Sequence, residues 1–179
     1  VAVGIIINVV TTTGIGNAFS LMIVEWAQGS LFITLVLVAL ASLVLGMGLP
    51  VTASYIVLAT LSAPLIYDLI SQSALLDALL TGIQAGDLPS NVAATLSLFG
   101  GDPLIALQEM PLEMKQLIRQ EMLPAELLTG MLLSAHLIIF WLSQDSNVTP
   151  PVCLASFAAA GIAGTNPMAT GLTSWKVAK

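Results

Sequence analysis

The stretch Gly46-Met47-Gly48-Leu49-Pro50 lies inside a tract, Trp26 to Tyr67, that contains no Asp, Glu, Lys or Arg. A second tract, Leu127 to Trp175, carries a single such charge within the polar insert Ser143-Gln144-Asp145-Ser146-Asn147-Val148-Thr149-Pro150-Pro151. A bilayer tolerates unwound backbone only where protein or a water-filled cavity satisfies the freed N–H and C=O groups. Paired, interrupted hydrophobic segments therefore indicate the central binding site of a transporter.

Composition supports a membrane protein. Hydrophobic residues make up 57% of the chain and charged residues only 8%, whereas an ordinary soluble domain has about 25% charged residues. We therefore predict an all-α, polytopic integral membrane protein. Four basic residues without a cluster exclude nucleic acid as a partner. The chain shows no metal-ligand cluster, phosphate loop, catalytic triad or paired carboxylates, so we expect neither an enzyme nor a cofactor.

Residues 1–66 are predicted to form a truncated helix (Val1 to Val10), a connecting helix (Ala18 to Gln28) and one discontinuous transmembrane helix. That helix would start after Ser30 as N-cap, break at Gly46 to Pro50 and end at Ile66. Proline lacks an N–H and opposes the carbonyl four residues earlier, which explains the break. Because the chain starts within an apolar run and stops soon after another helix begins, we expect a piece of a longer polytopic protein.

Residues 67–126 differ in kind, because they hold most of the charge and many Gly and Pro residues. We interpret them as an amphipathic, interfacial insertion with short helices at Asp68 to Leu80 and Pro111 to Met122, and a helix start at Asp102-Pro103. Lys115 and Arg119 are spaced i,i+4, and we expect their charges to be solvated or interfacial.

Residues 127–165 are predicted to form a re-entrant helical hairpin, and residues 166–179 the start of a further helix. One arm would run from Leu127 to Leu142 and the other from Pro151 to Ala163, with the polar insert as the tip. Sixteen residues and about a dozen are too few for two full crossings of a core of about 30 Å. The second arm is rich in Ala and Gly, which permit close helix packing in lipid.

The first break is a candidate site because unwound carbonyls can face a cation and freed N–H groups an anion. Gly46, Gly48 and Pro50 would contribute to a cation site, partly through backbone carbonyls. Thr52 and Ser54 supply hydroxyl groups for a substrate directly after the break. The alternative is a structural kink, which proline alone can produce.

The second break offers Asn147, Thr149 and Pro150 to a substrate, and Asp145 and Ser146 to a cation. If Pro150-Pro151 starts the second arm, the positive end of its helix dipole would suit a carboxylate. An intramembrane carboxylate indicates function, but Asp145 at a water-exposed tip is the alternative.

Two single residues in this tract can be explained by structural roles alone. His136 can be bonded to a backbone carbonyl or face the bundle, and a proton-relay role needs a partner that the sequence does not show. Cys153 reads as a small packing residue.

These motifs resemble a known family. The runs Gly46 to Tyr55, Ala135-His136-Leu137, Asp145 to Ala155 and Ala158 to Gly171, together with Thr13 to Gly16, are similar to the fused membrane subunit of TRAP (tripartite ATP-independent periplasmic) transporters. The likeness is to the branch that works with TAXI-type solute-binding proteins, and it covers Val1 to Ile66 and Met131 to Lys179. The family often joins these parts by a short link, whereas residues 67–126 intervene here.

The resemblance implies a sodium-driven symporter for an organic acid in the cytoplasmic (inner) membrane of a bacterium or archaeon. A periplasmic TAXI-type binding protein would deliver the substrate to an elevator-type transport domain built from inverted repeats, of which this chain is the second. The sodium site, carried over from the family, would lie at Gly46 to Pro50 and Ser146 to Pro150. Sodium would serve as coupling ion.

Two other classes of function remain open on the residues alone. A proton-coupled carboxylate carrier would use Asp145 or His136, and its uptake would follow a pH gradient and ignore sodium. A membrane scaffold without transport needs only apolar helices and does not require two Gly/Pro breaks.

Overall fold

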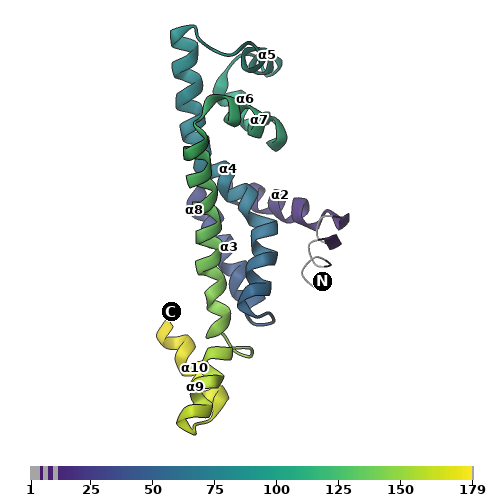
Figure 1. Ribbon diagram of the computed structural model, residues 1–179. Coiled ribbons are helices and arrows are strands. Elements are labelled where there is room, and N and C mark those ends of the chain that lie inside the picture. Colours follow the sequence, from purple (N-terminus) through teal and green to yellow (C-terminus); the bar gives the residue numbers. More distant parts are fainter. Residues whose placement is uncertain (1–4, 6–7, 10–11, 179) are drawn as a thin grey trace. The chain divides into compact units, whose positions relative to one another are not determined.

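The computed structural model describes residues 5, 8, 9 and 12–178, whose regular structure is helical throughout (Figure 1). The helices are α2 (Ile15–Ala27), α3 (Leu31–Gly46), α4 (Val51–Ala85), α5 (Ser90–Leu98), α6 (Pro103–Glu109) and α7 (Leu112–Met122), then α8 (Ala125–Ser143), the 3-10 helix η1 (Gln144–Asn147), α9 (Leu154–Ala163) and α10 (Pro167–Ala178). This confirms the all-α prediction. The truncated helix predicted for Val1 to Val10 lies largely outside the described residues.

The chain divides into two compact units. The split unit combines Val1–Ile66 with Ala135–Lys179, and the inserted unit is Tyr67–Ser134. The insertion predicted for 67–126 falls within the inserted unit, which also contains the beginning of α8.

Two helix starts agree with the sequence signals. The Ser30 hydroxyl accepts a hydrogen bond from the N–H of Ile33 (3.5 Å) at the start of α3. The Asp102 carboxylate accepts from the N–H of Leu104 (2.8 Å) at the start of α6. Such caps satisfy N–H groups that have no partner within the helix.

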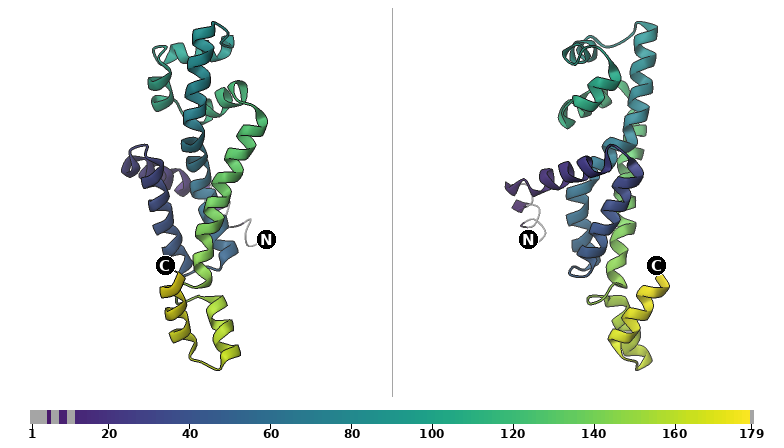
Figure 2. Two further views of the ribbon diagram at one scale, coloured as in Figure 1. Left: turned by 90° about the vertical axis from the view of Figure 1, so that its left-hand side faces the viewer. Right: turned by 180° about the vertical axis from the view of Figure 1, so that it is seen from behind.

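The first break is present, but the chain reverses there. Figures 1 and 2 show α3 and the first half of α4 running in opposite directions, with residues 47–50 at the tip between them. We had predicted one discontinuous helix through this break. The N–H groups of three successive tip residues turn back onto the last carbonyls of α3, so the turn closes on the helix it follows. Glycine and proline end a helix without specifying where the chain continues.

Helix α4 also continues well beyond the predicted end at Ile66. It includes Pro64 and extends to Ala85, so the separate helix predicted for Asp68 to Leu80 is its second half. A proline removes only one hydrogen bond from a long helix, and neighbouring groups can satisfy the carbonyl that it frees.

The second break separates two helices that continue in the same general direction. In both Figures 1 and 2, α9 leads onward from the end of α8, and the chain reverses only between α9 and α10. We had predicted a hairpin with its tip at the polar insert. The reversal lies instead at Gly164, whose φ of 66° is left-handed, a conformation that glycine adopts without strain.

Close packing holds α9 and α10 together. A Cβ atom on Gly171 of α10 would lie 2.7 Å from the Cys153 Sγ atom and 3.7 Å from Pro150. Cys153 is fully buried, as expected of a small packing residue. The absence of a side chain at Gly171 therefore allows α10 to approach the chain just before α9.

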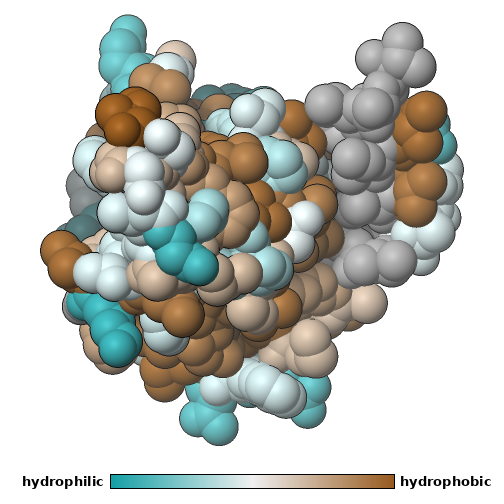
Figure 3. All heavy atoms as spheres, turned by 90° about the horizontal axis from the view of Figure 1, so that it is seen from below, coloured by the Kyte–Doolittle hydropathy of each residue, from teal (hydrophilic) through white to brown (hydrophobic). Residues whose placement is uncertain are grey.

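Two helices are long and apolar enough to cross a membrane by length and composition: Val51–Ala85, and Ala125–Asn147, which joins α8 and η1. The second exposes large apolar side chains, among them Leu133 (57%), Leu137 (57%) and Trp141 (73%). Figure 3 shows hydrophobic residues over much of the face seen from below. A membrane environment would cover such surface, as the composition predicted.

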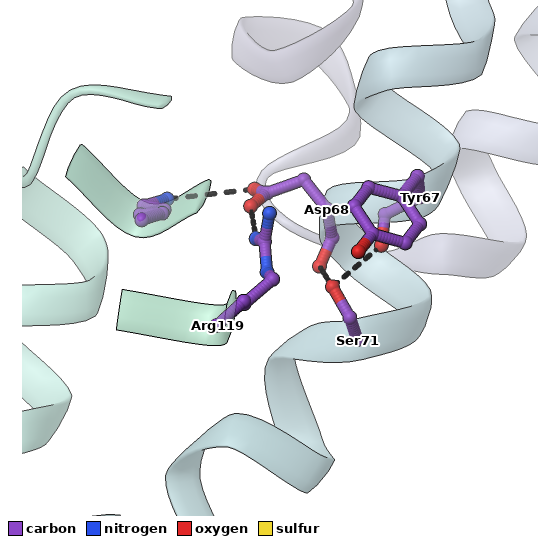
Figure 4. A network of polar contacts seen from close by, with 5 residues as sticks. Tyr67, Asp68, Ser71 and Arg119 are labelled. Atoms are coloured by element: carbon purple, nitrogen blue, oxygen red, sulfur yellow. Dashed lines mark hydrogen bonds and ion pairs between the residues drawn. The ribbon is translucent and has the colours of Figure 1, made fainter. Parts of the chain in front are cut away.

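The inserted unit has its own apolar core, formed by Leu75, Leu79, Val92, Leu96, Ala106, Leu107, Met110, Ile118 and Leu123. Beside it, Asp68 of α4 forms ion pairs with both basic residues of α7 (Figure 4). The Lys115 Nζ atom lies 3.4 Å from one carboxylate oxygen, and Arg119 binds the other. The Arg119 guanidinium also lies over the Tyr67 ring, 5.2 Å from its centroid.

We had predicted solvated or interfacial charges for these two basic residues, but the structure largely buries them. The side chain of Arg119 is 1% exposed and that of Lys115 is 12% exposed. Burial lowers the pKa of Lys115 and of Arg119 below their ordinary values. The carboxylate of Asp68 offsets the cost of removing their charges from water.

Candidate functional site

The first break forms a tightly closed turn at the end of α3. The N–H of Met47 donates to the carbonyls of Leu43 and Val44, and those of Gly48 and Leu49 both donate to Leu45. These bonds satisfy the last carbonyls inside α3. Pro50 follows as the residue before α4, and its carbonyl accepts from the N–H of Ser54 (2.9 Å).

The carbonyls of the turn itself are left available. In the described part of the chain, none of the backbone hydrogen bonds formed outside helices ends on a carbonyl oxygen of residues 46–49. They lie at the C-terminal end of α3, where the helix dipole carries partial negative charge. The turn can therefore offer oxygen atoms to a cation, and the role predicted for Gly46 and Gly48 stays a prediction.

The second break is organised by η1. The carbonyl oxygen of Asp145 accepts from the N–H groups of Val148 (3.1 Å) and Thr149 (2.9 Å), and from the Thr149 hydroxyl (2.6 Å). The Ser146 hydroxyl donates to the carbonyl of Ser143 (2.9 Å). The Asp145 carbonyl is thus fully used within the chain, whereas the Ser146 hydroxyl oxygen keeps lone pairs for another partner.

The two breaks meet at Gly46. A Cβ atom on Gly46 would lie 3.3 Å from both the Cα and the N atom of Ser146. Gly46 and Ser146 are both buried, and α3 packs against η1. Helix α8 ends at Ser143, directly before η1. The C-terminal ends of α3 and α8 consequently converge, although the two segments are about a hundred residues apart in sequence.

Within the described residues of the split unit, no basic side chain lies on α3, α8 or η1 to balance these two negative helix ends. Among the described residues of the split unit, Lys176 near the end of α10 is the only Lys or Arg. The arrangement therefore favours a cation that is not part of the protein. No group of three or more His, Cys, Asp or Glu that could hold a metal is found among the described residues. The ligands for a cation at this place would therefore be oxygen atoms of the backbone and of hydroxyl groups.

The remaining residues predicted for the site lie as follows. Pro50 and Thr52 are exposed beside the tip. Gly48 is also exposed, and a Cβ atom at this position would have only the Leu45 carbonyl oxygen near it, at 3.9 Å. Asn147 is half-buried and donates from its amide to the Gln144 side chain (3.2 Å). Thr149 is 2% exposed. Its hydroxyl is engaged within the break, which makes it a less available substrate ligand than predicted.

Ser54 is the most informative of the predicted hydroxyl residues. It is fully buried in the first turn of α4, and its Oγ atom has no hydrogen-bond partner. A buried hydroxyl without a partner is costly. It lies four residues after Pro50 and is therefore a candidate to contact a bound ion or substrate group.

The helix start on which we based an anion site at the second break lies later in the chain than predicted. Helix α9 begins at Leu154 and not at Pro150 or Pro151, because those prolines lie in the irregular segment that precedes it. The helix N-terminus beside the two breaks is that of α4. By the general rule for helix ends, the first N–H groups of α4 lack partners within the helix, and Thr52 lies among them.

The structure adds residues that the sequence did not single out. The Tyr55 hydroxyl lies 3.0 Å from the Nδ1 atom of His136, and the Tyr55 ring packs edge-on against Phe140 with centroids 6.0 Å apart. His136 thus has the polar partner that the sequence did not show. A tyrosine within a charge-free tract was the available signal, but nothing in the sequence indicates that two residues 81 positions apart are neighbours.

Comparison with known proteins identifies one family. The family model described as tripartite ATP-independent periplasmic transporter, DctM component, matches residues 1–178 of the chain. No curated protein and no solved structure matches the chain.

Proposed function

Since the chain belongs to the DctM family of tripartite ATP-independent periplasmic transporters, we propose that it imports an organic acid with sodium as the coupling ion. A DctM protein is a membrane-integral component of a secondary transporter, not an enzyme, and works with a periplasmic solute-binding protein. We further propose a fused, multi-pass subunit of the cytoplasmic membrane, served by a TAXI-type binding protein and moving its transport domain as an elevator.

The observation that supports sodium coupling is the convergence of two helix C-termini, neither of which has a basic residue on α3, α8 or η1 in the described part of the split unit. The ends of α3 and α8 meet where Gly46 packs on Ser146. Carbonyl oxygens of residues 46–49 and the Ser146 hydroxyl would coordinate the ion. Unwound backbone and half-helix C-terminal ends coordinate Na⁺ in transporters with discontinuous helices. The Asp145 carbonyl oxygen already accepts three hydrogen bonds. It would therefore act on the ion only through its partial negative charge and not as a direct ligand.

The substrate would bind on the other side of the same tip. The N-terminus of α4 presents N–H groups and the exposed Thr52 hydroxyl, and such a helix end favours an anion. Asn147 and the buried Ser54 hydroxyl would contact polar groups of the acid, and Thr149 and Pro150 would shape the wall. Sodium at one helix end and a carboxylate at the other would stabilise each other electrostatically.

The test is uptake by the full-length protein, reconstituted in proteoliposomes with its binding protein. We expect accumulation of candidate organic acids with an inward sodium gradient and none without it. Ser146→Ala should raise the sodium concentration for half-maximal uptake about tenfold, because it removes one proposed ligand. Ser134→Ala is the matched control, since that hydroxyl is exposed on α8 and bonds only to its own helix at Gly130.

Two results would contradict the proposal. Accumulation driven by a pH gradient and indifferent to sodium would move the coupling to Asp145 or His136. An unchanged sodium response in Ser146→Ala would remove η1 from the ion site.

A further inference from the structure

Within the split unit, α3 and the first half of α4 form a helical hairpin with residues 47–50 at its tip. The Tyr55–His136 pair joins α4 of this α3–α4 hairpin to α8. Tyr55 lies on α4, five residues after Pro50, and His136 lies on α8, eight residues before η1. Besides the hydrogen bond of 3.0 Å, the two rings have centroids 6.3 Å apart. Both side chains are half-buried. The pair therefore makes a specific polar contact between two apolar helices.

The α3–α4 hairpin is thus attached to the α8–η1 segment at two points. Helix α3 is attached through Gly46 on Ser146, and α4 through Tyr55 on His136 and Phe140. At 1.5 Å per residue, Tyr55 lies about 7 Å along α4 from Pro50. Because helices are stiff over such a distance, the contact on α4 restricts where the tip residues lie relative to η1.

We propose that Tyr55 and His136 form a positioning pair that sets the sodium affinity of the site between the two breaks. This inference rests on the proposed function. Neither side chain would touch the ion. Their hydrogen bond would hold the start of α4, and with it the carbonyls of residues 46–49, at the distance from Ser146 that a bound ion requires. Small misplacements of ligand groups are enough to weaken a site of this kind.

The chemistry of the pair is compatible with a positioning role. A tyrosine hydroxyl both donates and accepts. When His136 is neutral with its proton on Nε2, the hydroxyl donates to Nδ1; when the ring is protonated, Nδ1–H donates to the hydroxyl oxygen. The contact is therefore retained in both protonation states.

The experiment compares single and double variants of the full-length transporter in proteoliposomes. Tyr55→Phe removes only the hydroxyl, and His136→Leu removes the ring nitrogens. We expect each to raise the sodium concentration for half-maximal uptake by about two- to tenfold, the range that corresponds to one hydrogen bond. The KM for the substrate at saturating sodium should stay within about twofold. The double variant should be no worse than the more affected single one, because both remove the same interaction.

Two controls separate positioning from general damage. His136→Asn places an amide near the position of Nδ1 and should restore much of the sodium response. Thr60→Val removes a hydroxyl from the same helix that bonds only to its own turn at Ile56 (2.7 Å), and should leave the response unchanged. Equal losses in sodium response and substrate KM, or additive effects in the double variant, would overturn the positioning role.

Failure of the proposed function would look different. If wild-type uptake does not depend on sodium, the proposed function is wrong. The Tyr55–His136 contact is then tested by thermal unfolding, in detergent, of the wild type, the two single variants and the double variant. Non-additive midpoints would support the contact between α4 and α8, and additive midpoints would overturn it. Loss of pH-driven uptake in His136→Leu alone would identify a proton relay and refute the proposal.

Discussion

Gly46 and Gly48 belong to one motif but have different environments. A Cβ atom on Gly46 meets the backbone of Ser146 at 3.3 Å, whereas one on Gly48 finds only the Leu45 carbonyl at 3.9 Å. Neither has a φ in the left-handed region. The requirement for glycine at position 46 therefore comes from the approach of a distant segment and not from backbone conformation.

We expect Gly46→Ala to weaken sodium-dependent uptake about tenfold and Gly48→Ala to leave it nearly unchanged. Overpacking typically costs about 1–3 kcal/mol, and here the methyl group would meet backbone that cannot rotate away. Alanine otherwise favours a helix over glycine by about 1 kcal/mol, so a loss must arise from the contact with Ser146. The measurement is initial uptake rate against sodium concentration. Similar effects of both substitutions would mean that the contact does not shape the site.

At the scale of elements, α7 is attached to α4 by charges that are largely withdrawn from water. Asp68 pairs with both Lys115 and Arg119, yet the Nε and Nη1 atoms of Arg119 have no hydrogen-bond partner. The carboxylate is therefore the main compensation for two buried cations, and the Tyr67 ring adds a cation–π contact.

Removing the shared partner should do more damage than removing one of the cations. We expect Asp68→Asn to destabilise the inserted unit by about 3–5 kcal/mol, the usual cost of leaving a buried charge unpaired. Lys115→Met should cost less, since Arg119 still pairs with the carboxylate. Hydrogen exchange of amides in α5, α6 and α7 measures both effects. Glu113→Gln, on an exposed side chain of the same helix, is the control. Greater damage from Lys115→Met than from Asp68→Asn would contradict the assigned roles.

At the scale of the whole molecule, the inserted unit concentrates the charge of the chain. Its eight acidic and two basic residues give a net charge of −6, equal to that of the full sequence. Both basic residues are bound to Asp68, and the other seven acidic side chains are exposed. So acidic a surface does not belong inside a hydrocarbon core. The part of the unit that holds these charges, Asp68 to Glu126, should therefore lie on one side of the membrane, whereas the apolar residues from Leu127 onward belong to the second candidate span.

Labelling of single cysteines tests this arrangement. In a Cys153→Ala background, cysteines at the exposed positions Asp87 and Glu109 should react with a membrane-impermeant thiol reagent from the same side of the vesicle. The shared apolar core of the unit holds these positions in one compact body. Labelling from opposite sides would mean that the chain crosses the membrane between residues 87 and 109.

Helix class and the location of both breaks could be predicted from the sequence because each has a local cause. Ser30 and Asp102 cap helices through atoms two or three residues away. The predicted end of this helix at Ile66 was wrong, because the change in composition from Tyr67 onward was read as the end of the helix, whereas α4 continues through Pro64 to Ala85. The burial of Arg119 was missed for a different reason. Its partner Asp68 is 51 residues away, and an i,i+4 pair looks the same on a wet surface and in an ion-pair cluster.

For the candidate site, the sequence by itself determined which residues lack regular helical bonding and that apolar helices surround them. Composition required a membrane class, and Gly and Pro end helices wherever they stand. Only the tertiary structure decided the direction of the chain after each break: a reversal at 47–50, and continuation across 144–153. The physical reason is that glycine and proline remove local constraints without adding new ones. Contacts between distant segments, Gly46 on Ser146 and Tyr55 on His136, then select one arrangement and bring the two breaks together.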